Sequence, residues 1–279
     1  MNLHLHGMSA CDVAAVVVLG STAALYALGA RRLTLRGARV RRAERIAFWA
    51  GWIAAVVVVV PPIDTLAQRL FSVHMFQHEM LMLVATPLMI AGRPILGVLW
   101  GLPDRARMSI ARSHGTAAVA RLTAMLTLPL VAWLLHGLTV WAWHAPVLYE
   151  AAVRSERIHA IQHLTFVGSA AIFWWGLVYG RYGRAGYGAA VLYVFSTLVH
   201  TGVLGAVFTL SGTPFYDVYV QRAVAAGRDP VADQQLAGLV MWIPAGVVLT
   251  CFGLALFTGW LAASDRRTNR TRRYTPDPA

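Results

Sequence analysis

Seven long apolar stretches dominate this sequence and exclude most other folds. They cover approximately residues 10–30, 46–63, 71–91, 122–143, 161–179, 188–210 and 236–262. A helix that crosses the hydrocarbon core of a membrane needs about 20 predominantly apolar residues, and each stretch is close to this length. The valine-rich run at residues 54–60 does not alternate with polar residues, as the strands of a membrane β-barrel would. The sequence therefore predicts an all-α polytopic membrane bundle with seven transmembrane helices.

The distribution of basic residues predicts how this bundle is oriented. The chain has 24 basic and 12 acidic residues, and every basic residue is Arg. Nineteen of them lie in the connecting segments and tail on one side, and the other side has only Arg69, Arg154, Arg157, Arg222 and Arg228. Because basic residues in short loops mark the cytoplasmic side, we expect the N-terminus outside and the C-terminus in the cytoplasm. The net charge of +12 then reflects topology, and no nucleic-acid partner is expected.

The expected organisation is one transmembrane domain with short flanking segments. Residues 1–9 form an outer segment, residues 10–262 the transmembrane domain, and residues 263–279 a basic cytoplasmic tail that we expect to be disordered. No basic residue precedes the first apolar stretch, which favours a retained span over a cleaved signal peptide. The sequence has no Gly-rich phosphate loop, no Gly-x-Ser-x-Gly elbow and no His-Glu-x-x-His motif. We therefore expect a membrane protein that is not an enzyme.

Histidines are the unusual feature of this apolar chain, which contains ten of them. His74 and His78 open the third stretch, and His159 and His163 open the fifth. Residues four apart lie on one face of a helix, so each pair presents two imidazoles on the same side. His144 ends the fourth stretch on the same outer side. The sequence thus predicts that three helices place these five histidines at one level.

This arrangement points to a metal site. A single interfacial histidine is more often a hydrogen-bonding residue between helices, so the hypothesis depends on the number and the shared side of the five. Imidazole suits copper, zinc and iron, and an added thioether favours Cu(I). Further candidate ligands are His136, His200, Met75 and Glu79. Glu79 is equally compatible with a role beside the ligands and with a plain ion pair to an outer Arg.

Three segments resemble signatures of the CtaG family of bacterial cytochrome c oxidase assembly factors. One is residues 74–88, which begin His-Met-Phe-Gln-His-Glu-Met. Another is residues 141–150 followed by 158–163, and the last is residues 233–242. The sequence departs from the family pattern at Glu79, where an apolar residue is expected, and at Thr86, where a second proline is frequent.

The resemblance implies a seven-span, multi-pass protein of the bacterial plasma membrane that acts in the assembly of haem–copper cytochrome c oxidase. It also implies that the protein binds copper and delivers it to the oxidase. Cytochrome c oxidase subunits and a periplasmic copper donor would then be its partners, with the lipid bilayer around it. The positions that match the family are His74, His78, His144, His159 and His163. Asp233 and Gln234 match the outer-loop signature, without an assigned role.

Two alternatives remain open from the residues alone. The protein could transport copper or protons, with Glu79 as a relay inside the third span. It could instead be a haem-b redox protein in which His136 and His200, at comparable depth on different spans, are the axial ligands.

Overall fold

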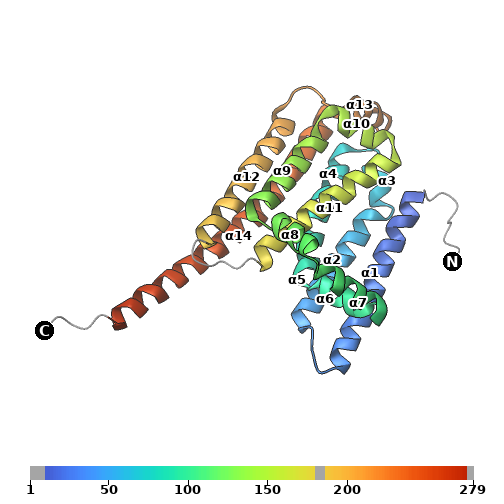
Figure 1. Ribbon diagram of the computed structural model, residues 1–279. Coiled ribbons are helices and arrows are strands. Elements are labelled where there is room, and N and C mark those ends of the chain that lie inside the picture. The colour runs from blue at the N-terminus through green and yellow to red at the C-terminus, as the bar shows by residue number, and fades with distance from the viewer. Residues whose placement is uncertain (1–9, 180–185, 275–279) are drawn as a thin grey trace.

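The computed structural model describes residues 10–179 and 186–274, and these residues form helices joined by short connections, with no strand among them (Figure 1). The elements are α1 (Ala10–Leu35), α2 (Arg42–Val59), α3 (Ile63–Ala67), α4 (Phe71–Glu79), η1 (Met80–Ala85), α5 (Thr86–Ala91), α6 (Pro94–Gly101), α7 (Asp104–His114), α8 (Ala117–Leu126), α9 (Pro129–His144), α10 (Pro146–Arg154), α11 (Glu156–Tyr179), α12 (Gly186–Leu210), α13 (Asp217–Ala225) and α14 (Pro230–Tyr274). The expected all-α class is confirmed for this part of the chain.

Among the described residues, four helices are long and apolar enough to cross a membrane, and the number rises to six if each of two bent helix pairs is one span. The four are Val13–Leu35, Glu156–Tyr179, Gly186–Leu210 and Pro230–Ala262. The stretch expected at 46–63 corresponds to α2, whose 18 residues include Arg42, Glu44 and Arg45. These three charges leave too short an apolar segment for α2 to qualify as a span by itself.

Of the expected stretches, the one at residues 122–143 contains a bend between two helices. The stretch at 122–143 is not one helix, because α8 and α9 meet at an angle of 67°. Pro129 begins α9, and a proline starts a helix readily but cannot continue one. A similar bend of 65° separates α6 from the third span. There Arg93 is left-handed (φ 54°) and Pro94 follows it.

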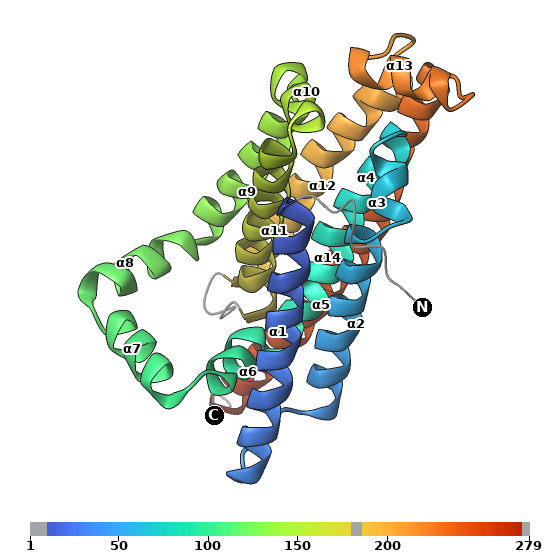
Figure 2. The same cartoon turned by 90° about the vertical axis from the view of Figure 1, so that its right-hand side faces the viewer.

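The long helices pack side by side, and short helices lie at both ends of the bundle. α10 and α13 lie at the same end of the bundle as α4 in both views, whereas α6 and α7 lie toward the other end (Figures 1 and 2). Small residues permit the close packing of α12 against α14. A Cβ atom added at Gly238 would lie 2.6 Å from the Gly205 carbonyl oxygen, so these helices approach backbone to backbone.

The C-terminal boundary also differs from the expectation. α14 continues without a break to Tyr274, so the segment after residue 262 is helical rather than an irregular tail. Residues 275–279 lie outside the described part of the chain, as does the outer segment 1–9 with His4 and His6.

Candidate metal centre

The first turn of α4 is held by a side chain from a distant part of the sequence. The carboxylate of Asp233, on α14, accepts a hydrogen bond from the backbone N–H of Phe71 at 2.7 Å and another from the Ser72 hydroxyl. The first N–H groups of a helix have no partner within it, and a carboxylate there also interacts favourably with the helix dipole. Asp233 therefore caps the helix that carries His74 and His78, which gives this signature residue a structural role.

Gln234 holds the neighbouring loop. Its side-chain oxygen accepts a hydrogen bond from the backbone N–H of Phe215 at 2.7 Å, and its amide nitrogen donates to the carbonyl oxygen of Thr213 at 3.0 Å. These two bonds fix the connection between α12 and α13 against α14. Together, Asp233 and Gln234 attach the start of α4 and the loop before α13 to one turn of α14.

A π-helical segment, η1, follows α4 directly. Thr86 ends it, and the Thr86 hydroxyl donates to the Leu81 carbonyl oxygen at 2.7 Å. Short π-helical insertions widen a helix and occur frequently at functional sites. The sequence departure at Thr86 thus supplies a hydrogen bond to a carbonyl of the widened turn.

Four histidines from two helices form one cluster. His74 and His78 come from α4, and His159 and His163 come from α11; each offers one ring nitrogen, and these four nitrogens lie within 4.8 Å of one another. The ring centroids are 4.3 Å apart within the first pair and 4.2 Å apart within the second. Across the helices, His78 and His163 are separated by 5.0 Å. Four converging imidazoles can supply a four-coordinate site for a transition metal.

Hydrogen bonds determine which nitrogen of His74 is available to a metal. The hydroxyl of Tyr219, on α13, donates to the carbonyl oxygen of Ala67 at 2.8 Å and lies 3.1 Å from Nδ1 of His74. Burial raises the pKa of Tyr219, so the hydroxyl keeps its proton at neutral pH. Because that proton is given to Ala67, the Tyr219 oxygen accepts from Nδ1–H of His74. Nε2 of His74 then carries the lone pair that a metal needs.

The buried nitrogens of the cluster fit a metal ion. His74 and His78 are each only 2% exposed. Nε2 of His74, both ring nitrogens of His78 and Nε2 of His163 are buried, and none has a hydrogen-bond partner within the described residues. A buried polar atom that lacks a partner costs roughly 1–3 kcal/mol. Coordination of a metal by these nitrogens would remove that cost.

His144, the fifth expected ligand, does not belong to this cluster. It ends α9, and its Nδ1 lies 2.7 Å from the carbonyl oxygen of Val140. Its nearest aromatic neighbours are Phe208, Tyr149 and Phe166, with ring-centroid distances of 5.8 to 6.2 Å. The structure thus brings four of the five predicted histidines together and places the fifth on a neighbouring helix.

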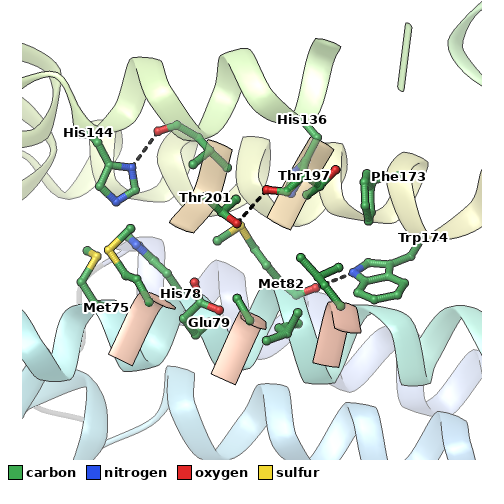
Figure 3. A pocket seen from close by; sticks show the side chains of 15 residues that line it. Met75, His78, Glu79, Met82, His136, His144, Phe173, Trp174, Thr197 and Thr201 are labelled. Carbon is green, nitrogen blue, oxygen red and sulfur yellow. Dashed lines mark hydrogen bonds between the residues drawn. The ribbon is translucent and has the colours of Figure 1, made fainter. Parts of the chain in front are cut away.

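The further candidate ligands divide into two groups. Met75 and Glu79 adjoin the cluster and line a cavity together with His136 (Figure 3). Glu79 forms no ion pair within the described residues, so the pairing with an outer Arg, one of the two roles left open for it, is not seen there. His200 instead packs against Trp133, with ring centroids 5.7 Å apart, and accepts from Trp141.

The residues of the haem alternative have separate surroundings. Nδ1 of His136 lies 3.2 Å from the Ser169 hydroxyl on α11, and its ring lies 5.0 Å from Phe173. His200 contacts tryptophans of α9. The two imidazoles therefore have different nearest neighbours, and the haem alternative stays a hypothesis.

The sequence reasoning missed Tyr219 as part of the site. Its segment is outside the apolar stretches, and a tyrosine in a short connecting helix has no recognisable spacing to the histidines. Asp233 is part of the segment at residues 233–242 that resembles the family, but that pattern does not indicate that its side chain caps α4.

The fold and the histidine cluster define an all-helical protein with several candidate membrane spans and a candidate metal centre at one end of the bundle. Residues 24–263 match the cytochrome c oxidase caa3 assembly factor family (Caa3_CtaG). This match covers most of the chain, and the protein belongs to that family. The resemblance seen in the three sequence segments is thereby confirmed.

Similar proteins occur in mycobacteria. Uncharacterised proteins of Mycobacterium bovis and Mycobacterium tuberculosis are each 27% identical over 255 residues, covering 89% of this chain and 39% of the relative. An uncharacterised protein of Mycobacterium leprae is 23% identical over 272 residues, covering 92% of this chain and 40% of the relative. The chain thus spans about two fifths of the length of these relatives. No solved structure matches it.

Proposed function

We propose that this protein binds copper and delivers it to cytochrome c oxidase during assembly of the oxidase, without being an enzyme itself. The observation that supports this most strongly is the convergence of four histidine nitrogens within 4.8 Å. Membership of an oxidase assembly family supplies the recipient, which is a copper-containing enzyme. Partners would be the oxidase subunits and a periplasmic copper donor.

Copper is the metal that the surroundings favour. Neutral imidazoles bind copper and zinc well, and a thioether next to them shifts the preference toward Cu(I). Met75 lies between His74 and His78 in the sequence and is buried. A delivery protein must also release its metal, and ligands from only two helices permit exchange with an incoming partner more readily than a closed cage does.

The proposed topology places this cluster near the outer surface of the plasma membrane, on the side of the periplasmic copper donor. We propose seven spans in the bacterial plasma membrane, with α2 and the two bent pairs crossing in addition to the four long helices. The excess of Arg in the α1–α2 connection and in α7 marks their side as cytoplasmic. His74 and His159 then lie near the outer surface, beneath α10 and α13.

Metal analysis of the purified protein tests the proposal. We expect the full chain in detergent to retain copper after loading with Cu(I) or Cu(II), and the double substitution His78→Ala with His163→Ala to abolish retention by the cluster. Both substitutions remove ligands from the same four-nitrogen set. The copper content per chain is measured by mass spectrometry. His114→Ala is the control, because His114 is exposed at the end of α7.

An unchanged copper content in the double variant would show that the cluster is not the binding site. In cells, deletion of the protein should lower oxidase activity, and added copper should restore part of it. Activity that stays low at every copper concentration would indicate an assembly role that does not involve copper delivery.

A further inference from the structure

A cavity adjoins the four-histidine cluster on the inner side of His78. It measures about 50 Å³ and lies between α4, η1, α9, α11, α12 and α14. His78 lines this cavity and is also a member of the cluster, so the two are adjacent and share one residue. A space of roughly 10–15 Å³ already holds one water molecule, so this cavity has room for a metal ion.

The lining of the cavity is rich in soft donors. Three of the nine methionines of the chain, Met75, Met82 and Met241, line it. Along α4 and η1, one thioether precedes the imidazole and the carboxylate that line the cavity, and another follows them. The lining residues of this segment include, in order, Met75, His78, Glu79 and Met82. Thioether and imidazole ligands together select Cu(I) over harder divalent ions.

His144 faces the same cavity from α9, opposite His78 and Glu79 (Figure 3). A carbonyl oxygen can only accept a hydrogen bond, so the contact with Val140 places the proton of His144 on Nδ1. Nε2 therefore carries the lone pair, and it is buried with no hydrogen-bond partner in the described structure. This is the arrangement found in metal-binding histidines, where a carbonyl holds the ring and sets its tautomer.

The charge of the lining also suits a monovalent cation. Glu79 is the one acidic residue among those that line the cavity, and it has no ion-pair partner in the described part of the chain. A carboxyl group without a partner is costly to ionise at membrane depth, and such a group is usually paired or functional. One carboxylate and one Cu(I) ion have a net charge of zero.

We propose that this cavity is a second copper site, specific for Cu(I), in which His144 and the thioethers of Met75 and Met82 are the ligands and Glu79 supplies the compensating charge. His78 connects this site with the four-histidine cluster. A copper ion can then pass between the sites by exchange of ligands at His78, without any change of oxidation state. The inference rests on the proposed copper-binding function and adds a binding site to it.

Counting Cu(I) in matched variants tests the second site. The purified full chain is titrated with Cu(I) in the presence of a chromophoric chelator, and the bound metal is examined by X-ray absorption. We expect about two Cu(I) ions per chain, with sulfur in the coordination shell. Met82→Leu with His144→Phe should lower this to about one and weaken the sulfur signal. Met125→Leu, on exposed α8, is the control and should change neither value.

The cluster variant separates this inference from the proposed function. His159→Ala with His163→Ala leaves every cavity ligand in place, so it should retain about one Cu(I) ion that is bound through sulfur. If the wild-type chain binds one ion and the cluster variant binds none, the second site is overturned while the cluster stands. If the wild-type chain binds no copper, both proposals fail.

Discussion

Single hydrogen bonds decide which histidine nitrogens can bind a metal. In His74 the acceptor is the oxygen of Tyr219, and in His144 it is the carbonyl oxygen of Val140. Both contacts involve Nδ1, so both residues direct the unprotonated Nε2 toward the interior. A hydrogen bond to the ring nitrogen that does not bind the metal orients the imidazole and raises its basicity. The loss of such a bond typically lowers metal affinity by a factor of about 10–100.

The substitution Tyr219→Phe tests this at the residue scale. It removes the hydroxyl that orients His74, and we expect the Cu(I) affinity of the cluster to fall by a factor of about 10–100. Competition with a chelator of known affinity measures the change. Tyr216→Phe is the matched control, because its hydroxyl donates to the main-chain oxygen of His144 and does not touch the His74 ring. Equal losses in both variants would contradict a specific role for Tyr219.

At the scale of the element, the site depends on where helices begin and bend. α4 begins at Phe71 because Asp233, 162 residues further along the chain, accepts its N–H. The π-helical segment after Glu79 and the bend before Pro129 both interrupt stretches that look uniform in hydropathy. Apolar composition predicted that helices exist in these regions. It carried no information about the cap or the widened turn, because those depend on individual hydrogen bonds.

Asp233→Asn tests the cap of α4. The substitution removes the negative charge at the start of the helix, and such a charge typically contributes about 0.3–1 kcal/mol to the free energy of unfolding, or up to ~2 kcal/mol where it is partly buried. We expect a lower melting temperature in detergent and a lower copper affinity, because the first turn of α4 carries His74. Asp229→Asn is the control, because the Asp229 carboxylate accepts a hydrogen bond from the backbone N–H of Val231 in the first turn of α14. It should lower stability without affecting copper binding.

A copper affinity that is unchanged in Asp233→Asn, at a clearly reduced melting temperature, would show that the cap serves stability alone. The same reduction of copper binding in Asp229→Asn would indicate that general loosening of the bundle, and not the start of α4, controls the site.

At the scale of the whole molecule, the proposed orientation determines which compartment the cluster faces. The Arg-rich connection between α1 and α2 lies at one end of the bundle, and α10 and α13 lie at the other (Figures 1 and 2). α13 supplies Tyr219 and α10 supplies Tyr149, whose ring lies 5.5 Å from that of His74. These two short helices therefore cover the metal cluster on the side that we propose to be external.

Labelling of introduced cysteines tests this orientation. In a chain whose own Cys11 and Cys251 are replaced by serine, Ala226→Cys should react with a membrane-impermeant maleimide in intact spheroplasts. Ala38→Cys should react only after permeabilisation, because the Arg-rich loop is expected to be cytoplasmic. Both alanines are exposed at opposite ends of the bundle, so access differs only by compartment. The reverse pattern would place the histidine cluster on the cytoplasmic side and exclude a periplasmic donor.

The sequence by itself determined the helical class, the family and the presence of histidine pairs on helix faces. These follow from local properties, since helix formation in lipid and the spacing of residues on one helix depend on short windows of sequence. Only the tertiary structure decided that His74 and His78 meet the α11 pair, while His144 joins the cavity with Met75 and Glu79. Such contacts depend on how helices far apart in the chain pack together, and no local pattern of residues encodes that packing.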